Sequence, residues 1–313
     1  MLLPAWVGYA LLGFFGFGIT NFLLGCVAQW SGGDVQASIS APILVWCAMG
    51  IAGAVAAGLF SATGRGYRGI PARRLVWVAA VAGVTLSAGM LTLKLGLASD
   101  PTARGPIVAI TATNAMLVAL LAYGILKEKL SAAQLAGFLV IVAGLVTIGL
   151  ASGASASLRG LFYGLLTMLL FSITNYLLKH AGHRGANSLS ATAILWLASG
   201  GVGVAGIVVT FLSGRGLAGL DSPGSIAASL VAGLFLALGM FGIKTAVTRG
   251  PGGPATAITG SNAILVTLLD WLYFGHWPPA QKMIGMLVAL LGIVVLALGG
   301  RHAPPKRTEE GEA

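Results

Sequence analysis

The chain has 313 residues, of which 57% are hydrophobic and 8% charged, and its mean hydropathy is +0.93. About a quarter of the residues in a soluble domain are charged, so this composition excludes a water-soluble fold and indicates a protein that crosses a bilayer. The net charge of +10 does not indicate a nucleic-acid partner, because most of the excess Lys and Arg lies in short connections between apolar runs.

Ten apolar runs are long enough to cross a membrane, since a transmembrane helix needs about 20 residues. The first five helices are expected at residues 4–28, 35–60, 75–98, 103–126 and 131–151. The second five are expected at residues 158–180, 188–212, 224–247, 253–275 and 279–299. Residues 301–313 mix prolines with both signs of charge, which predicts a disordered tail. The expected fold class is therefore an all-α polytopic membrane protein with ten transmembrane helices.

The two groups of five helices resemble each other in sequence. Residues 17–24 (FGITNFLL) match residues 171–178 (FSITNYLL) at six of eight positions, with an offset of 154. In the fourth helix of each group, residues 109–115 (AITATNA) match residues 257–263 (AITGSNA), with an offset of 148. Two further pairs have an offset of 150: Trp46 with Trp196, and Lys94 with Lys244. Apolar composition alone would not bring Asn, Trp and Lys into register, so the pattern indicates an internal repeat.

The number of helices in each repeat predicts their relative orientation. Residues 1–152 form the first five-helix repeat and residues 153–300 the second. Because five is odd, the second repeat enters the membrane from the opposite side. The two repeats are then inverted and related by a pseudo-two-fold axis in the membrane plane, which is an architecture of secondary transporters.

The distribution of Lys and Arg predicts how the chain is oriented. Twelve of them lie in the loops after even-numbered helices and in the tail: Arg65, Arg68, Arg73, Arg74, Lys127, Lys129, Lys179, Arg184, Arg249, Arg301, Lys306 and Arg307. Four lie in the loops after odd-numbered helices: Arg104, Arg159, Arg215 and Lys282. Both termini are therefore expected in the cytoplasm. Without a transit peptide, the expected location is the plasma (inner) membrane.

The fourth helix leads through residues 123–130 (YGILKEKL) into a fifth helix with regularly spaced glycines. Together with the five-plus-five repeat, this segment resembles the EamA branch of the drug/metabolite transporter superfamily over nearly the whole chain. Members commonly carry a Gly-Glu pair at the end of the fourth helix, where this chain has Lys127-Glu128. The resemblance implies transport of small organic metabolites, such as amino acids or drugs, without naming the solute.

Two asparagines at equivalent positions are the main candidates for a solute site. Asn114 and Asn262 lie roughly ten residues into their helices, which places them near the middle of the bilayer at about 1.5 Å per residue. Thr111 and Thr259 precede them by three residues, on the same helix face. These groups either hydrogen-bond neighbouring helices or form the transporter's central site. We expect the two asparagines to face each other across the pseudo-two-fold axis.

Other repeated polar and aromatic residues extend this candidate site. Trp46 and Trp196 lie well inside their helices, where they either pack in the core or line the cavity as an apolar wall. Asn21 and Asn175 recur in the first and sixth helices with a preceding threonine. They either line the same cavity or, with that threonine, mark a bend in the helix.

Charged residues near the helix ends are candidates for gating. Lys94 and Lys244 either extend to the headgroups or line the two mouths of one path, where they attract an anionic group or pair with acids. Asp270 lies inside the ninth helix near its outer end. An ion pair with Lys94, a proton-binding carboxylate and a solvated helix end are all compatible with its position.

The predicted function is secondary-active transport, as an exporter of a small organic metabolite, by alternating access. Two other classes are a non-transporting membrane partner protein and an intramembrane enzyme. The sequence has no P-loop, zinc-binding spacing or nucleophile elbow, so neither an enzyme activity nor a cofactor is expected. Besides the solute and the bilayer, a homodimer is a possible partner, because glycines spaced by seven residues in the fifth and tenth helices allow close packing within or between chains.

Overall fold

The computed structural model describes residues 4–32, 34–62, 72–99, 107, 110–111, 113–127, 130–150, 157–275 and 277–299. All regular secondary structure in these residues is α-helical. The helices are α1 (Ala5–Trp30), α2 (Ala37–Ala62), α3 (Arg73–Ser99), α5 (Asn114–Leu126), α6 (Ala132–Leu150), α7 (Leu158–His183), α8 (Ser188–Leu212), α9 (Pro223–Arg249), α10 (Gly252–Gly260), α11 (Ala263–Phe274) and α12 (Ala280–Gly299). The predicted all-α class is confirmed. The predicted tail at 301–313 lies outside the described residues.

Short polar residues fix where several helices begin. The side chain of Ser157 accepts a hydrogen bond from the Gly160 amide at the start of α7. Asn187 accepts hydrogen bonds from the Leu189 and Ser190 amides at the start of α8. These side chains satisfy amides that lack a partner in the first helical turn. The helix starts therefore follow from the polar residues that bound the apolar runs.

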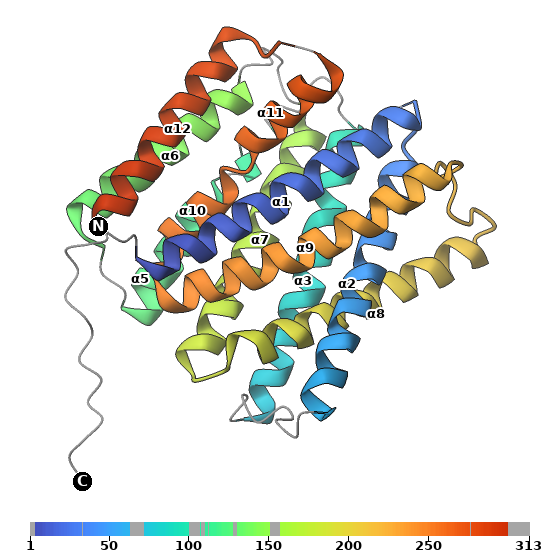
Figure 1. The fold of residues 1–313 in the computed structure, drawn as a ribbon, viewed down its shortest axis with the longest axis horizontal. Coiled ribbons are helices and arrows are strands. Elements are labelled where there is room, and N and C mark those ends of the chain that lie inside the picture. Colours follow the sequence, from blue (N-terminus) through green and yellow to red (C-terminus); the bar gives the residue numbers. More distant parts are fainter. Residues whose placement is uncertain are drawn as a thin grey trace.

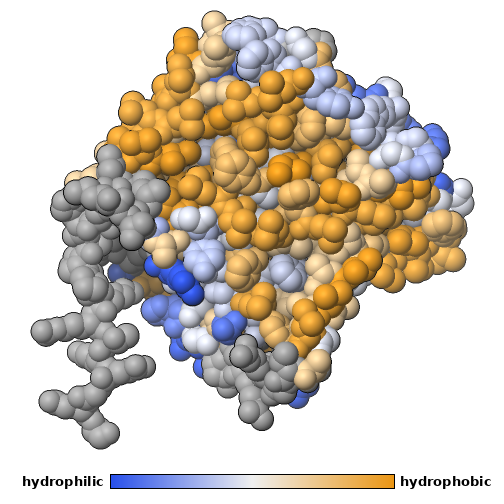
Figure 2. Space-filling model, viewed as in Figure 1, coloured by the Kyte–Doolittle hydropathy of each residue, from blue (hydrophilic) through white to orange (hydrophobic). Residues whose placement is uncertain are grey.

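Seven helical segments in the described residues are long and apolar enough to cross a membrane: α1, α2, α3, α7, α8, α9 and the run of α10 and α11 taken together. Three further apolar helices, α5, α6 and α12, are shorter. Figure 2 shows an apolar surface across the middle of the molecule, with hydrophilic residues toward its lower-left and upper-right ends. Large apolar side chains such as Ile51, Leu59 and Val209 are exposed. The chain is thus a multi-pass membrane protein.

Two predicted helices are interrupted, which corrects the expectation of unbroken spans. A turn at Ser261 and Asn262 divides the ninth into α10 and α11. In the predicted fourth helix, a turn at Thr113 precedes α5. Residues 103–106 and three other residues of this predicted helix are not described. Hydropathy misses such breaks because a single turn barely changes the mean over a window of about 19 residues.

Helices from the two halves of the chain pack in pairs. α1 lies against α9, α2 against α8, α3 against α7, and α6 against α12. Figure 1 shows α1 and α9 side by side across the bundle and the α6–α12 pair along one edge. The main helix contacts therefore join residues far apart in the sequence, and neither half packs as a separate bundle.

Glycines bring the paired helices close together. A Cβ atom added to Gly50 of α2 would lie 2.6 Å from the Cα atom of Gly200 of α8, and one added to Gly200 would in turn meet Gly50. These two residues are separated by 150 positions, the offset that relates Trp46 to Trp196. Residues at equivalent positions in the two halves are thus in direct backbone contact.

Other glycine contacts occur twice, at positions related by the same offset. A Cβ atom at Gly83 would meet the carbonyl oxygen of Leu195, and one at Gly233 would meet that of Val45. In each case the glycine of one half packs against the second helix of the other. The sequence repeat is accordingly accompanied by repeated packing.

The α2–α8 contact leads to a stability prediction. Gly200→Ala should lower the melting temperature in detergent relative to Gly201→Ala, because only the first methyl group would meet a backbone. The control is matched, since nothing lies within 4 Å of a Cβ atom at Gly201 and both changes give the same gain in helix propensity. Forcing a methyl group into a packed contact typically costs about 1–3 kcal/mol. Equal melting temperatures would contradict the close contact.

Candidate functional site

The interruptions of the fourth and ninth predicted helices both lie at the repeated asparagines. The Thr113 hydroxyl donates to the Ile110 carbonyl oxygen at 2.6 Å, and α5 begins at the next residue, Asn114. The Ser261 hydroxyl donates to the Ile258 carbonyl oxygen at 2.6 Å, immediately before Asn262. Hydroxyl groups at equivalent positions therefore add a second hydrogen bond to a carbonyl oxygen at each break, since the amides of Thr113 and Ser261 donate to the same oxygens.

Asn262 connects its own break to α1. Its Nδ2 atom donates to the carbonyl oxygens of Thr259 at 3.0 Å and Gly260 at 3.4 Å, at the end of α10. Its Oδ1 atom accepts a hydrogen bond from Nδ2 of Asn21 at 3.1 Å. Both asparagines are partly exposed. The structure thus brings together two of the residues that the sequence predicted, from the first and ninth helices.

Asn114 is held from the other half, by α7. Its carbonyl oxygen accepts a hydrogen bond from the Ser172 hydroxyl at 3.2 Å. The Ser172 hydroxyl also lies within hydrogen-bonding distance of the Met168 carbonyl oxygen, at 2.7 Å, and the Thr113 hydroxyl contacts the sulfur of Met168 at 3.2 Å. Asn175, one turn further along α7, is partly exposed. The relation of α7 to the first break therefore resembles that of α1 to the second.

Thr111 and Thr259 are buried, and both bond to backbone. The Thr111 hydroxyl donates to the Ile107 carbonyl oxygen at 2.9 Å. The Thr259 hydroxyl lies within hydrogen-bonding distance of the carbonyl oxygens of Ala255, at 3.0 Å, and of Ala10 in α1, at 3.2 Å. In this conformation the two threonines brace the helix segments before each break.

Trp46 and Trp196 lie in the core, with exposed fractions of 3% and 8%. Their indole Nε1 atoms are buried and have no hydrogen-bond partner in the part of the chain that the structure describes. An unpaired buried donor is unfavourable by about 1–3 kcal/mol. The two side chains therefore combine a large apolar surface with a hydrogen-bond donor that is not used in this conformation.

Lys244 is fully buried, with an exposed fraction of 0%. Its Nζ atom donates to the Leu178 carbonyl oxygen of α7 at 2.6 Å and to the Thr248 hydroxyl at 3.0 Å. The neighbouring Lys179 of α7 donates in the opposite direction, to the carbonyl oxygens of Val247 at 2.8 Å and Gly250 at 2.9 Å. We call these reciprocal bonds between α7 and the end of α9 the lysine clamp.

The burial of Lys179 was not predicted from the sequence, in which this residue was counted among the loop cations. The predicted sixth helix ends at residue 180, whereas α7 continues to His183 and buries Lys179. One signal was available, because Lys179 lies four residues after Asn175 and so on the same helix face.

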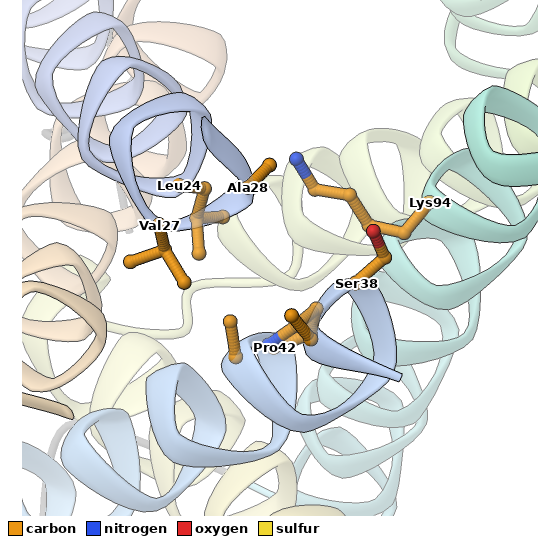
Figure 3. A pocket seen from close by; sticks show the side chains of 8 residues that line it. Leu24, Val27, Ala28, Ser38, Pro42 and Lys94 are labelled. Carbon is orange, nitrogen blue, oxygen red and sulfur yellow. The ribbon is translucent and has the colours of Figure 1, made fainter. Parts of the chain in front are cut away.

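Lys94 occupies the opposite end of the molecule. It lines a cavity of about 30 Å³ together with Leu24, Val27, Ala28, Ala37, Ser38, Ala41 and Pro42. Figure 3 shows its side chain extending past Ser38 toward Ala28 of α1. A cavity of this size holds about one or two water molecules and no organic solute. Asp270 lies on α11, partly exposed, and its pairing with Lys94 stays a prediction.

Comparisons with known proteins identify the relatives of this chain. A model of the EamA-like transporter family matches residues 158–298, which confirms the family resemblance over the second half of the chain. A solved structure described as "Crystal structure of protein" is similar over 95% of this chain and 99% of its own, with a TM-score of 0.71 and 18% identity. At that identity the likeness shows the fold alone. No curated protein matches the sequence.

The Asn21–Asn262 contact can be measured by a double-mutant cycle. Asn21→Ala and Asn262→Ala should be coupled by about 0.5–1.5 kcal/mol in the free energy of unfolding, because either change removes the same hydrogen bond. Asn187, which caps α8 in a loop, provides the control: Asn21→Ala and Asn187→Ala should be additive. A coupling near zero for the first pair would show that the amides do not interact.

Proposed function

From the membership of this chain in the EamA-like transporter family, we propose that it is a secondary transporter that exports a small organic metabolite, such as an amino acid or a drug-like solute. One observation carries the proposal beyond the family. Two helices are interrupted at Asn114 and Asn262, which the sequence repeat makes equivalent. Interrupted helices near the bilayer midplane form the substrate sites of many secondary transporters.

The architecture that we propose is two inverted five-helix repeats, with ten transmembrane helices. The repeated glycine contacts support it, because Gly50 and Gly200 meet at equivalent positions and the contacts of Gly83 and Gly233 correspond. The α1–α9 and α3–α7 pairings are also exchanged by such symmetry. A solute held near the axis can then be exposed to either side as one half rocks against the other.

The solute that suits this site is polar or zwitterionic with an apolar part. The asparagine amides offer donors and acceptors without a fixed charge. Asn21 and Asn175 extend the polar surface from α1 and α7. Trp46 and Trp196 would supply apolar walls when the site opens.

The charged residues at the two ends fit a role in opening and closing. The lysine clamp joins α7 to α9 at one end of the molecule. At the other end, Lys94 of α3 lies beside residues of α1 and α2. Carbonyl oxygens are neutral acceptors, so exchanging them for water requires no separation of opposite charges. We propose that the clamp breaks when its end of the molecule opens, and that Asp270 serves the opposite end.

A membrane partner protein and an intramembrane enzyme stay as alternative functions. EamA family members are transporters, and a partner protein would not require equivalent polar breaks in two helices. Purified protein in liposomes separates these classes, because only a transporter moves solute across the bilayer without another protein.

Transport by site variants tests the central site. With amino acids and drug-like amines as the solute panel in proteoliposomes, Asn114→Ala and Asn262→Ala should weaken solute affinity by roughly tenfold or more, since each leaves a bound polar group unpaired. Thr147→Ala is a control, because that hydroxyl bonds a carbonyl oxygen of its own helix, at Ala143. Unchanged affinity in both asparagine variants, with folded protein, would rule out this site.

The orientation of the chain has its own test. Reporter fusions at Arg68 and after Arg301 should both report the cytoplasm, as the excess of Lys and Arg on that side predicts. A fusion at Arg215 should report the outer side. A periplasmic signal from either of the first two would contradict the model with ten helices and both termini inside.

A further inference from the structure

A groove of about 430 Å³ lies between the ends of α5 and α7. Ile125 and Leu126 line it from α5, and His180, His183 and Arg184 line it from the end of α7. It combines an apolar wall with cationic or protonatable side chains. This groove is separate from the helix breaks and from the lysine clamp, whose Lys179 points toward α9.

The groove lies where a helix bundle meets the headgroup layer. Tyr123 and Ile125 of α5 are exposed beside it, with exposed fractions of 66% and 57%. His183, Arg184 and Lys127 lie at the helix ends and are exposed. Apolar side chains below a cationic rim match a lipid, whose acyl chains lie beside the helix and whose phosphate lies at its end.

One polar group in the groove lacks a partner. The Nδ1 atom of His180 is buried and has no hydrogen-bond partner among the described residues, although the ring packs near Tyr176 with 6.0 Å between ring centres. The carbonyl oxygen of His180 accepts the Arg184 amide at 3.1 Å, so the end of α7 is itself capped. A headgroup oxygen or hydroxyl would satisfy the free imidazole nitrogen.

The charge around the groove has one sign among the described residues. The packing of α3 against α7 brings the start of α3, with Arg73 and Arg74, to the same end of the bundle. The described acidic residues, Asp34, Asp221 and Asp270, belong to the opposite end. The described charges at this end therefore attract an anionic ligand and repel the ammonium group of a zwitterionic lipid. Glu128, two residues after Leu126, lies outside the described residues.

We propose that this groove binds the headgroup of an anionic phospholipid, with His183 and Arg184 on the phosphate and Ile125 and Leu126 beside the acyl chains. Lipid binding at this groove requires no solute and no transport step, so its test is independent of the proposed function. Phosphate is also the chemistry of soluble anions, and the experiment separates the two sources.

The test uses the full chain in nanodiscs of phosphatidylcholine with and without phosphatidylglycerol, and native mass spectrometry of retained lipid. The protein should retain phosphatidylglycerol over phosphatidylcholine by about fivefold to thirtyfold, as expected for one or two cationic contacts. H183Q combined with R184Q should abolish the preference. R215Q, which removes an exposed cation in the loop between α8 and α9 at the opposite end, should retain it.

Melting temperatures in the same nanodiscs provide a second readout. Phosphatidylglycerol should raise the melting temperature of the unaltered chain and of R215Q, but not of the H183Q/R184Q variant. Millimolar inorganic phosphate should neither displace the lipid nor stabilise the protein. Displacement by inorganic phosphate would show that the occupant is a soluble anion and overturn the proposal. An equal preference in the unaltered chain and the double variant would overturn it as well.

Discussion

The backbone contact between Gly50 and Gly200 is the constraint on which the rest of the bundle depends. Lipid is as apolar as a leucine side chain, so helices in a membrane gain little from hydrophobic burial and associate through close packing and hydrogen bonds. Where α2 crosses α8, the absence of side chains lets the backbones touch. α3 and α9 then pack on this pair through Gly83 and Gly233. Because 47 of the 313 residues are glycine, such contacts recur through the α6–α12 pair.

Polar groups inside this tightly packed bundle are arranged around the two helix breaks. An unwound turn leaves carbonyl oxygens that lipid cannot satisfy, and the chain supplies Thr113, Ser261 and Asn262 to bond them. α1 and α7 add one polar contact each, through Asn21 and Ser172. These hydrogen bonds allow the helices to be interrupted without loss of protein stability. The asparagine amides at the breaks can then bind a solute, which is the physical basis of the proposed site.

Hydropathy predicted the approximate limits of most of the described helices but not the two breaks, because a helix that faces lipid or other helices must be apolar on nearly all sides. The repeat also identified Asn262 and Asn21, which the structure brings together. Neither signal could predict which helices meet, since partner choice depends on side-chain size along each face. The burial of Lys179 was missed for a related reason. Its position near a helix end resembles that of a loop cation, and only the packing of α7 on α9 shows that it is enclosed.

The central claim is that two halves related by the sequence repeat open the two ends of the molecule alternately. Electron spin resonance distances in nanodiscs test it most directly, in a chain whose Cys26 and Cys47 have been replaced. One label pair joins the halves at the end of the lysine clamp, at Arg74 and Arg249, and the other joins them at the opposite end, at Ala98 and Gly224. The account predicts that a transported solute changes the two distances in opposite directions. Two distances that stay constant, or lengthen together, in a preparation that transports would contradict it.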